Sequence, residues 1–294
     1  MHRGSAPLEG AALIEAASGC DLIVSYRQSP APSALFERLP NLVAFLRCAV
    51  DIRNVDVDAA NRAGVLVTQA SAGFVPAVSE LVVGFLVDLS RGVSRAAAEY
   101  HAGRVPAAST GRELRGSTLG IIGYGAIGRE LSRVAKALGM RVLVNDPYVK
   151  DAEQTSFDVL LAQSDYVVPL AVATPETENL MNEAAFAKMK PGAYFINVSR
   201  GNLVDEAALA RALDAGRIAG CALDVGRAPD QMPKPALAAR ADVIATPHTA
   251  GLTLPAIEHQ SLETVAQAAE ILKGRAPKGA VNAQHWTRKG LLKP

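Results

Sequence analysis

The sequence predicts an α/β fold with two domains, each built on a parallel sheet. Short apolar runs alternate with stretches of helical periodicity along most of the chain, which is typical of successive βαβ units. The length of 294 residues is enough for about two domains, and 49% apolar residues support large cores. The most specific observation is one stretch, residues 118–146, that reads without interruption as strand, glycine turn, helix and strand.

Composition excludes several classes of protein. The formal net charge is +1 and no block of basic residues occurs, so nucleic acid is not an implied partner. Cys20, Cys48 and Cys221 are scattered and form no C-x-x-C pair, which argues against a disulfide framework or a metal site and fits a reducing cytosol. The start of the chain has no apolar signal core, and no run approaches the length of a membrane span. We therefore expect a cytoplasmic protein that binds no membrane.

The first third of the chain reads as an α/β unit that carries no nucleotide motif. The expected strands cover 21–26, 42–46 and 65–68, and the expected helices between them cover 33–39 and 58–63. The longest helical stretch, 75–100, follows. It is either a connector between two domains or a helix of the core, and the sequence barely separates these two interpretations.

The glycine turn has the pattern of a dinucleotide-binding unit. Gly123, Gly125 and Gly128 stand in G-x-G-x-x-G spacing between an apolar strand and an amphipathic helix. The first glycine permits a tight turn, the second lets a pyrophosphate approach the backbone, and the third lets helix and strand pack closely. Free N–H groups at the helix start, at Ala126 and Ile127, and the positive end of the helix dipole would hold the phosphates.

An acidic residue completes this pattern. Asp146 ends the following strand, about 20 residues beyond the turn, where it can accept hydrogen bonds from both ribose hydroxyls. Its charge would repel a 2′-phosphate, so NAD is favoured over NADP. The sequence thus predicts a Rossmann-type NAD-binding domain rather than a glycine-rich turn in an ordinary α/β protein.

The alternation continues to the end of the chain. The expected strands cover 166–170, 194–198, 219–225 and 243–245, and the expected helices cover 156–161, 182–189, 206–215 and 255–273. Ligands of open parallel sheets bind outside the carboxyl ends of the strands. Arg200, Asp224 and His248 all fall at or near such ends, so we group them as candidate functional residues.

These residue types suit a reaction at an oxidised carbon. Arg200 can hold a carboxylate with two parallel hydrogen bonds, and His248 is a natural proton carrier near neutral pH. A carboxylate beside the histidine would favour the imidazolium and fix its tautomer. Taken singly, each residue has an ordinary alternative: a solvated arginine, a loop histidine bonded to backbone, or a capping aspartate. The remaining histidines are expected on the surface: His2, His101, His259 and His285.

The chain resembles the D-isomer-specific 2-hydroxyacid dehydrogenases from about Asp21 to Asn282. The matching segments are ELRGSTLGIIGYGAIGRE, KMKPGAYFINVSRGNLVDEAALARAL, GRIAGCALDV and ATPHTAG. The resemblance implies a Rossmann-type domain with a smaller flavodoxin-like substrate domain, NAD as cofactor, and a homodimer formed through the nucleotide domain.

The resemblance also implies roles for matched positions. Arg200 would bind the substrate and His248 would be the acid/base, while Asp224 would contact the nicotinamide carboxamide and Thr174 would line the cofactor. Two loops would face the substrate, where backbone N–H groups receive its carboxylate. The residues expected there are Ala49, Val50, Ala72 and Gly73.

Three departures from the family pattern bear on the prediction. The family usually has a glutamate that pairs with the histidine. Pro229 occupies that slot here, and we expect the neighbouring Asp230 to take the role. Ala49 and Asp51 stand where the family tends to have glycines, and an acid there would disfavour a phosphate on the substrate. Only about 20 residues precede the first matching strand, so the substrate domain looks shortened; we expect the true start to lie upstream rather than an exposed sheet edge.

These observations lead to one prediction with alternatives. We expect a substrate domain at 1–75 and 275–294, with Val281 and Asn282 returning to it, and an NAD-binding domain at 76–274. The predicted activity is reversible hydride transfer between NADH and a small 2-keto acid. The alternatives are a reductase tuned to hydroxypyruvate or glyoxylate, an NAD-sensing binding protein without catalysis, and an impaired or truncated paralogue.

Overall fold

A computed structural model describes residues 7–292 of the chain. The chain divides into two units, which are described separately below. Unit 1 comprises residues 1–73 and 254–294, and unit 2 comprises residues 74–253. Residues 1–6 and 293–294, which the sequence assigns to the substrate domain, lie outside the described residues.

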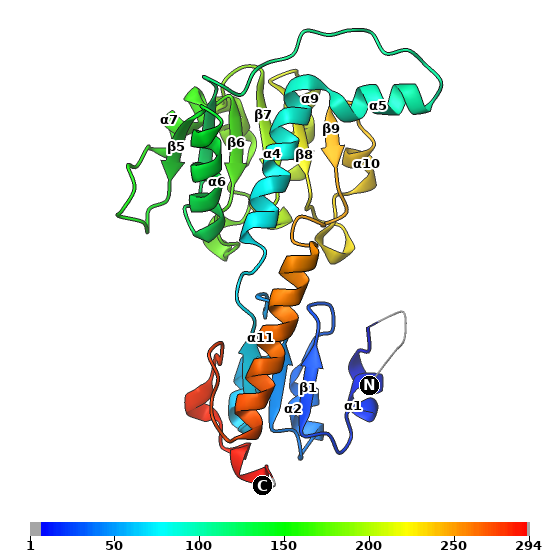
Figure 1. The fold of residues 1–294 in the computed structure, drawn as a ribbon, viewed down its shortest axis with the longest axis vertical. Coiled ribbons are helices and arrows are strands. Elements are labelled where there is room, and N and C mark those ends of the chain that lie inside the picture. Colours follow the sequence, from blue (N-terminus) through cyan, green and yellow to red (C-terminus); the bar gives the residue numbers. More distant parts are fainter. Residues whose placement is uncertain (1–6, 293–294) are drawn as a thin grey trace. The chain divides into compact units, whose positions relative to one another are not determined.

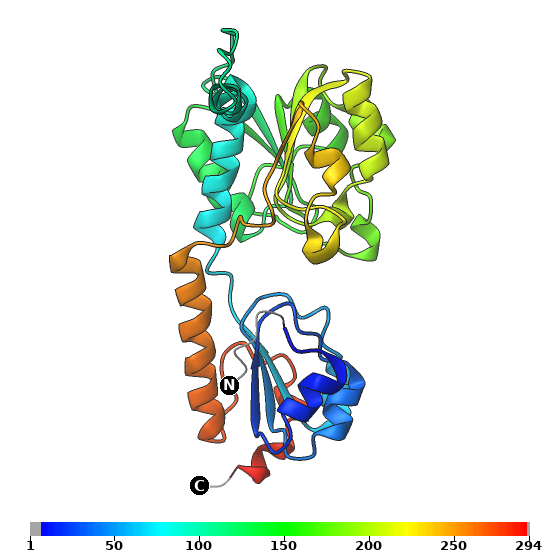
Figure 2. The same ribbon diagram turned by 90° about the vertical axis from the view of Figure 1, so that its right-hand side faces the viewer.

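Unit 1 is a three-stranded parallel sheet with helices on both faces. The strands are β1 (Leu22–Ser25), β2 (Ala44–Arg47) and β3 (Leu66–Gln69), in the order β1-β2-β3. One face packs against α1 (Gly10–Ala16), α2 (Ser33–Arg38) and α3 (Val57–Ala63), and the other packs against α11 (Leu254–Leu272). Figures 1 and 2 show these two layers on opposite sides of the sheet. All residues of the central strand β2 are buried, as expected for a parallel strand covered on both faces.

The end of the chain returns to this sheet. The N–H of Val281 donates to the carbonyl of Val67. The buried side chain of Asn282 accepts from the N–H of Val67 at 2.8 Å. Trp286 is buried beside Leu46, and its indole N–H donates to the carbonyl of Val43 at 3.2 Å. Two short helical turns follow, η4 (Ala283–His285) and η5 (Arg288–Leu291). Val281 and Asn282 therefore return to unit 1.

The long helix α11 lies in unit 1, whereas the sequence analysis placed residues 254–274 in the NAD-binding domain. The reason is packing on the three-stranded sheet. Gln267 accepts from the hydroxyl of Thr68 at 2.8 Å and donates to the carbonyl of Gln69 at 2.9 Å, and Ile271 is fully buried against β2. Helical periodicity reveals that a helix has an apolar face, but it does not reveal which sheet that face covers.

Unit 2 is a six-stranded parallel sheet in the order β5-β4-β6-β7-β8-β9. Its strands are β4 (Thr118–Ile122), β5 (Arg141–Asn145), β6 (Tyr166–Pro169), β7 (Ala193–Asn197), β8 (Ile218–Leu223) and β9 (Val243–Ala245). Helices α4 (Val75–Arg91) and α6 (Ala126–Ala137) cover one face. The other face carries α7 (Phe157–Gln163), α8 (Glu183–Lys188), α9 (Glu206–Asp214) and the short α10 (Pro235–Ala238). The predicted α/β class with two parallel sheets is confirmed.

The predicted helix over 75–100 is two helices. Gly92 adopts a left-handed conformation with φ of 66°, which ends α4, and α5 (Val93–His101) follows in a new direction (Figure 1). Helix α4 buries Val78, Val82 and Leu86 against the six-stranded sheet, so it is a core helix of unit 2. By contrast, α5 buries none of its residues.

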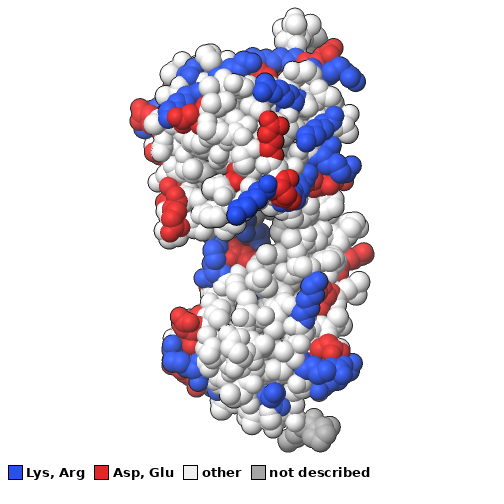
Figure 3. Space-filling view, turned by 90° about the vertical axis from the view of Figure 1, so that its left-hand side faces the viewer, with Lys and Arg blue, Asp and Glu red and all other residues white. Residues whose placement is uncertain are grey.

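The surface carries charges of both signs. Figure 3 shows Lys and Arg side chains interspersed with Asp and Glu side chains over the face that it draws. Between residues 7 and 292, no helix combines the length and the apolar character that a membrane crossing requires.

Candidate functional site

The glycine turn lies where the strand order of unit 2 reverses. Strand β4 pairs with β5 on one side and β6 on the other, and such a switch point is the usual place for a ligand. Gly123 has φ of 99°, and a Cβ there would lie 2.5 Å from the backbone N of Ala171. A Cβ at Gly128 would lie 2.4 Å from the carbonyl O of Gly123. Both positions require glycine because the backbone on the other side cannot move away.

Gly125 differs, because no protein atom lies within 4 Å of the Cβ position there. It is the N-cap of α6, a twelve-residue helix, and no side chain caps the first turn. The uncapped N–H groups, which begin at Ala126 and Ile127, and the helix dipole favour an anion at this end. Open space beside an uncapped helix start fits the pyrophosphate of a dinucleotide.

Asp146 follows β5 and holds the glycine turn. Its Oδ2 accepts from the N–H of Tyr124 at 2.7 Å, and its Oδ1 accepts from the N–H of Tyr148 at 3.0 Å. Each carboxylate oxygen retains further acceptor capacity for a ribose hydroxyl. Arg129, whose guanidinium lies over the ring of Tyr124, forms a bidentate pair with Asp151 at 2.7 and 2.8 Å. The negative charge of Asp146 thus favours a ribose with a free 2′-hydroxyl over one with a 2′-phosphate, because the neighbouring cation Arg129 is already paired.

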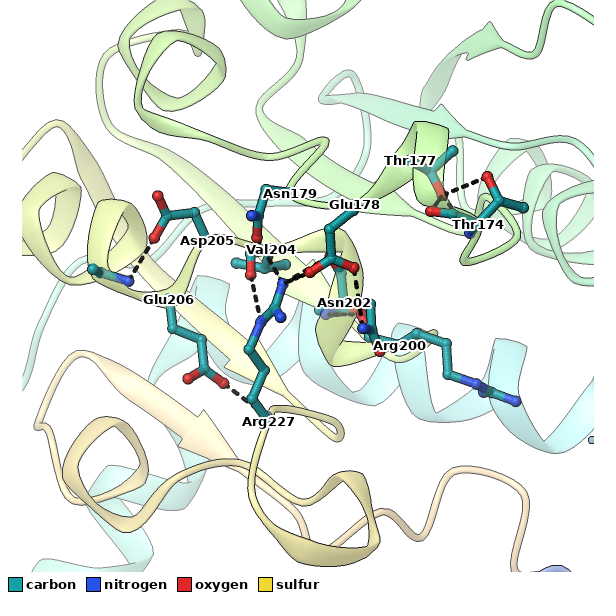
Figure 4. Close-up of polar contacts among 12 residues, drawn as sticks. Thr174, Thr177, Glu178, Asn179, Arg200, Asn202, Val204, Asp205, Glu206 and Arg227 are labelled. Carbon is teal, nitrogen blue, oxygen red and sulfur yellow. Dashed lines mark hydrogen bonds and ion pairs between the residues drawn. The ribbon is translucent and has the colours of Figure 1, made fainter. Parts of the chain in front are cut away.

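Arg200 lies in the turn after β7. The buried Asn197 at the end of this strand donates to the carbonyl of Arg200 at 2.9 Å and accepts from the N–H of Ser199 at 3.1 Å. Behind the turn, a Cβ at Gly201 would lie 2.1 Å from the carbonyl O of Gly226, so only glycine fits. The turn is therefore held from both sides, and the half-buried Arg200 side chain extends away from the neighbouring polar cluster (Figure 4).

Asp224 is fully buried at the end of β8, and its carboxylate holds the loop after β9. It accepts from the hydroxyl of Thr246 at 2.6 Å, from the N–H of Thr249 at 2.8 Å and from the N–H of Ala250 at 3.0 Å. Its own carbonyl accepts from the N–H of His248 at 2.9 Å. The printed sequence offers no signal for this role, because an aspartate after a strand has many possible partners. The expected contact with nicotinamide stays a prediction.

His248 is half-buried, has φ of 55°, and contacts Asp230 through the main chain. Its Nδ1 lies 2.8 Å from the carbonyl O of Asp230. A carbonyl can only accept, so Nδ1 carries the hydrogen and Nε2 is left as the nitrogen that exchanges a proton with a ligand. The sequence analysis expected the Asp230 side chain beside the histidine. The contact described here needs only the backbone, and the role of the carboxylate stays a prediction.

Thr174 lies in the loop after β6. Its N–H donates to the hydroxyl of Thr177 at 2.8 Å, which closes the short turn η1 (Pro175–Thr177) shown in Figure 4. The loops after β6, β7, β8 and β9 all leave the same edge of the sheet, because all strands are parallel. Unit 2 thus places Thr174, Arg200, Asp224 and His248 at one edge.

The loops expected to face the substrate lie side by side in unit 1. The N–H of Ala70 donates to the carbonyl of Ala49 at 3.0 Å, so the loop over residues 47–51 contacts the loop over 70–73. These loops contain the predicted substrate-binding residues Ala49, Val50, Ala72 and Gly73.

Helix α11 holds the second of these loops, a feature that the sequence analysis missed. Glu263 accepts from the N–H and from the hydroxyl of Ser71, each at 2.7 Å, and His259 Nε2 lies 2.8 Å from the same hydroxyl. A Cβ at Gly73 would lie 2.3 Å from Cδ2 of His259. His259 is exposed, as the sequence analysis expected, but its contact with Ser71 was not predicted. A separation of 188 residues leaves no local pattern that joins it to Ser71.

We predict that Gly73→Ala raises the KM for the 2-keto acid that the sequence analysis expects as substrate, because the new methyl group displaces the loop or the His259 ring. The double variant Gly73→Ala, His259→Ser removes the ring and should restore most of the parent KM, measured by steady-state kinetics at saturating NADH. An unchanged KM in the single variant would contradict this contact.

Within the described part of the chain, no three His, Cys, Asp or Glu side chains gather as metal ligands would.

Comparison with known proteins agrees with this geometry. The family model "D-isomer specific 2-hydroxyacid dehydrogenase, NAD binding domain" matches residues 83–250. D-3-phosphoglycerate dehydrogenase 2 of Arabidopsis thaliana is 37% identical over 245 residues, which are 81% of this chain and 39% of the relative. D-3-phosphoglycerate dehydrogenase of Archaeoglobus fulgidus is 33% identical over 270 residues, which are 89% of this chain and 51% of the relative. The chain therefore spans about half the length of these curated relatives or less.

Solved structures match both units. D-lactate dehydrogenase of Escherichia coli has a TM-score of 0.83 and 30% identity, and the match covers 91% of this chain and 88% of that one. A glyoxylate reductase of Paecilomyes thermophila has a TM-score of 0.82 and 26% identity, with coverage of 95% and 90%. From the glycine turn, the strand-end residues and these matches, the chain belongs to the D-isomer specific 2-hydroxyacid dehydrogenase family, with an NAD-binding domain at its centre.

Proposed function

We propose that the chain is an NAD-dependent D-2-hydroxyacid dehydrogenase that reduces a small 2-keto acid, with Arg200 and His248 as its catalytic side chains. The observation that carries this proposal is their placement. Arg200 and His248 follow β7 and β9, on either side of β8, at the sheet edge that also carries the glycine turn. A cation and a proton carrier at the edge that holds the nucleotide are what hydride transfer to a keto acid requires.

In this mechanism Arg200 binds the substrate carboxylate and polarises the adjacent keto group. NADH, when bound, supplies the hydride. His248, held through Nδ1, donates its Nε2 proton to the keto oxygen as the carbon accepts the hydride, so the C=O bond becomes CH–OH and the imidazolium becomes neutral imidazole. In the reverse direction, His248 removes the hydroxyl proton.

We further propose that the substrate carries no second anionic group such as a phosphate. Arg47 is fully buried, and its guanidinium donates to the carbonyls of Tyr26 and Ser29 and to the side chain of Asn54. This burial lowers the pKa of Arg47 to about 10. The other arginine of this segment, Arg53, is paired with Asp51 at 2.6 Å. Arg47 and Arg53 are thus committed within the protein, which favours small acids such as glyoxylate, hydroxypyruvate or pyruvate.

The proposal includes a homodimer formed through unit 2. Helix α5 buries none of its residues, and Val93 and Tyr100 are 55% and 62% exposed. A second copy that covers this helix would remove these apolar side chains from water. We expect sedimentation to give twice the chain mass of 30.7 kDa, and a single species at 30.7 kDa would contradict the dimer. The free thiols of Cys20, Cys48 and Cys221 support a reducing compartment such as the cytoplasm.

A substrate panel tests the proposal. NADH oxidation is followed by absorbance with glyoxylate, hydroxypyruvate, pyruvate, 2-ketobutyrate and phosphohydroxypyruvate, at neutral pH. We expect turnover of one or more small acids and a lower kcat/KM for the phosphorylated one. A preference for the phosphorylated acid would overturn the substrate assignment. NADH binding without turnover of any acid would instead favour a non-catalytic NAD-binding protein.

A further inference from the structure

Arg227 connects loops that carry predicted functional residues. It lies in the loop after β8, three residues beyond the buried Asp224. Its Nη2 forms an ion pair with Glu178 at 2.7 Å and donates to the side chain of Asn179 at 2.6 Å. The same nitrogen lies 3.0 Å from the carbonyl O of Asn202, and Nε donates to the carbonyl of Val204 at 3.1 Å. Figure 4 shows this guanidinium at the centre of its acceptors.

These acceptors belong to two other strand-end loops. Glu178 and Asn179 follow the Thr174 turn after β6, and Asn202 and Val204 follow Arg200 after β7. A second contact joins the two loops directly, because the side chain of Asn202 donates to Glu178 Oε2 at 3.1 Å. One arginine therefore fixes the loop after β8 to the loop that carries the cofactor-lining threonine and to the loop that carries the substrate-binding arginine.

The backbone of Arg227 is fixed from the opposite side. Its N–H donates to Glu206 Oε1 at 2.8 Å, and Lys234 pairs with the other oxygen of this carboxylate at 2.8 Å. The loop then closes on itself, since the N–H of Gly226 donates to the carbonyl of Gln231 at 2.8 Å. The closed segment contains Asp230, whose carbonyl contacts His248. Displacement of Arg227 would therefore be transmitted to the group that orients His248.

The Glu178 carboxylate in this network stays ionised at neutral pH. The hydrogen bond from Arg227, and then that from Asn202, holds the pKa of the Glu178 carboxyl below its usual value. An exposed ion pair by itself contributes little to stability. The acceptors of Arg227 come from two different loops, the loop after β6 and the loop after β7. Arg227 therefore contributes more to the relative position of these loops than to the stability of the fold.

We propose that Arg227 is a positioning residue for the reaction: it fixes the Asp230 segment against the Arg200 and Thr174 loops, so that His248 and Arg200 keep the spacing that one substrate requires. In this chain the loop after β8 lacks the usual histidine-pairing glutamate. Arg227, which does not contact His248 itself in this network, holds the loop in place through its bonds to the loops after β6 and β7. This inference rests on the proposed function, because it assigns Arg227 to the same reaction.

The test compares Arg227→Gln and Arg227→Lys with the parent. Small misplacement of reacting groups can cost ~10²-fold in rate, so we expect kcat for Arg227→Gln to fall by about 10- to 100-fold. NADH affinity should change less than kcat, because Arg227 contacts the Thr174 loop but makes no contact with the glycine turn or with Asp146. Lysine keeps the charge but lacks the planar fork, so Arg227→Lys should recover part of kcat.

The pH profile separates positioning from a purely structural role. A loosened segment should weaken the hydrogen bond between His248 Nδ1 and the Asp230 carbonyl. Reduction needs the protonated histidine, so the pH at which kcat/KM declines should differ between Arg227→Gln and the parent. Arg211→Gln is the matched control, since Arg211 forms an exposed pair with Glu183 at 2.9 Å in the same unit. This variant should leave kcat and the pH profile of kcat/KM unchanged.

Two results would overturn the inference. One is an Arg227→Gln variant with the kcat and pH profile of the parent. The other is a variant whose only defect is a lower unfolding temperature, with unchanged activity per folded molecule. If the parent itself reduces no keto acid, the proposed function has failed; NMR titration of His248 in the parent and in Arg227→Gln then still tests the positioning role, and equal pKa values would refute it.

Discussion

Replacement of His248 by glutamine is expected to lower kcat for keto acid reduction by ~10²–10⁴-fold, the usual contribution of a general acid. Glutamine approximates the size of the imidazole but cannot donate a proton to the keto oxygen at neutral pH. NADH affinity should remain that of the parent, because the cofactor contacts proposed at the glycine turn and at Asp146 are untouched. Steady-state kinetics and fluorescence titration with NADH measure the two quantities. A variant that retains more than about a tenth of the parent kcat would exclude His248 as the acid.

The same assay distinguishes the two ways in which Asp230 can hold the histidine. The described contact is with its main-chain carbonyl, at 2.8 Å from Nδ1. Asp230→Asn keeps this carbonyl, and asparagine tolerates the φ of 55° at this position. The sequence analysis assigns the orienting role to the carboxylate, so we expect kcat of Asp230→Asn to fall. A kcat equal to that of the parent would assign the role to the main-chain carbonyl alone.

Replacement of Arg200 by lysine is the second large effect. Lysine keeps the charge but cannot form two parallel hydrogen bonds to a carboxylate. Loss of one hydrogen bond to a charged group costs about 1.5–3 kcal/mol, so kcat/KM should fall by ~10- to 150-fold. Most of the loss should fall on the KM of the keto acid, with the remainder on kcat through a misdirected keto group.

Two comparisons make the Arg200 result specific. Arg211→Lys changes an exposed arginine of the same unit and should leave kcat/KM unchanged. NADH affinity of Arg200→Lys should equal that of the parent. Weaker NADH binding with an unchanged KM for the keto acid would place Arg200 in the cofactor site and contradict its proposed role.

Local pattern was enough to predict the nucleotide unit. The strand, glycine turn, helix and strand of β4, α6 and β5 fall where the sequence indicates, because the turn glycines and the helix that follows interact with near neighbours in the chain. Strand ends were equally accessible, since a parallel sheet gathers its carboxyl ends at one edge. That is why Arg200, Asp224 and His248 could be grouped before any contact was known.

Contacts between distant segments could not be predicted in this way. The carboxylate of Asp224 holds a loop more than 20 residues away, and Arg227 reaches Asn179 across 48 residues. Neither pairing leaves a periodic signal. The assignment of α11 to the NAD-binding domain failed for a related reason. An apolar helix face is compatible with either sheet, and only the contacts of Gln267 with Thr68 and of Ile271 with β2 show which sheet it covers. The break at Gly92 was missed because helical periodicity continues across it.

The most direct test of the central claim is the product formed by the purified chain. NADH and pyruvate or hydroxypyruvate are incubated at neutral pH, NADH loss is followed by absorbance, and the hydroxy acid is separated by chiral chromatography. We predict one D-2-hydroxy acid formed for each NADH consumed, with NADPH a much poorer donor because of Asp146. A folded chain that binds NADH but forms no hydroxy acid from any small keto acid, or that forms the L enantiomer, would contradict the account.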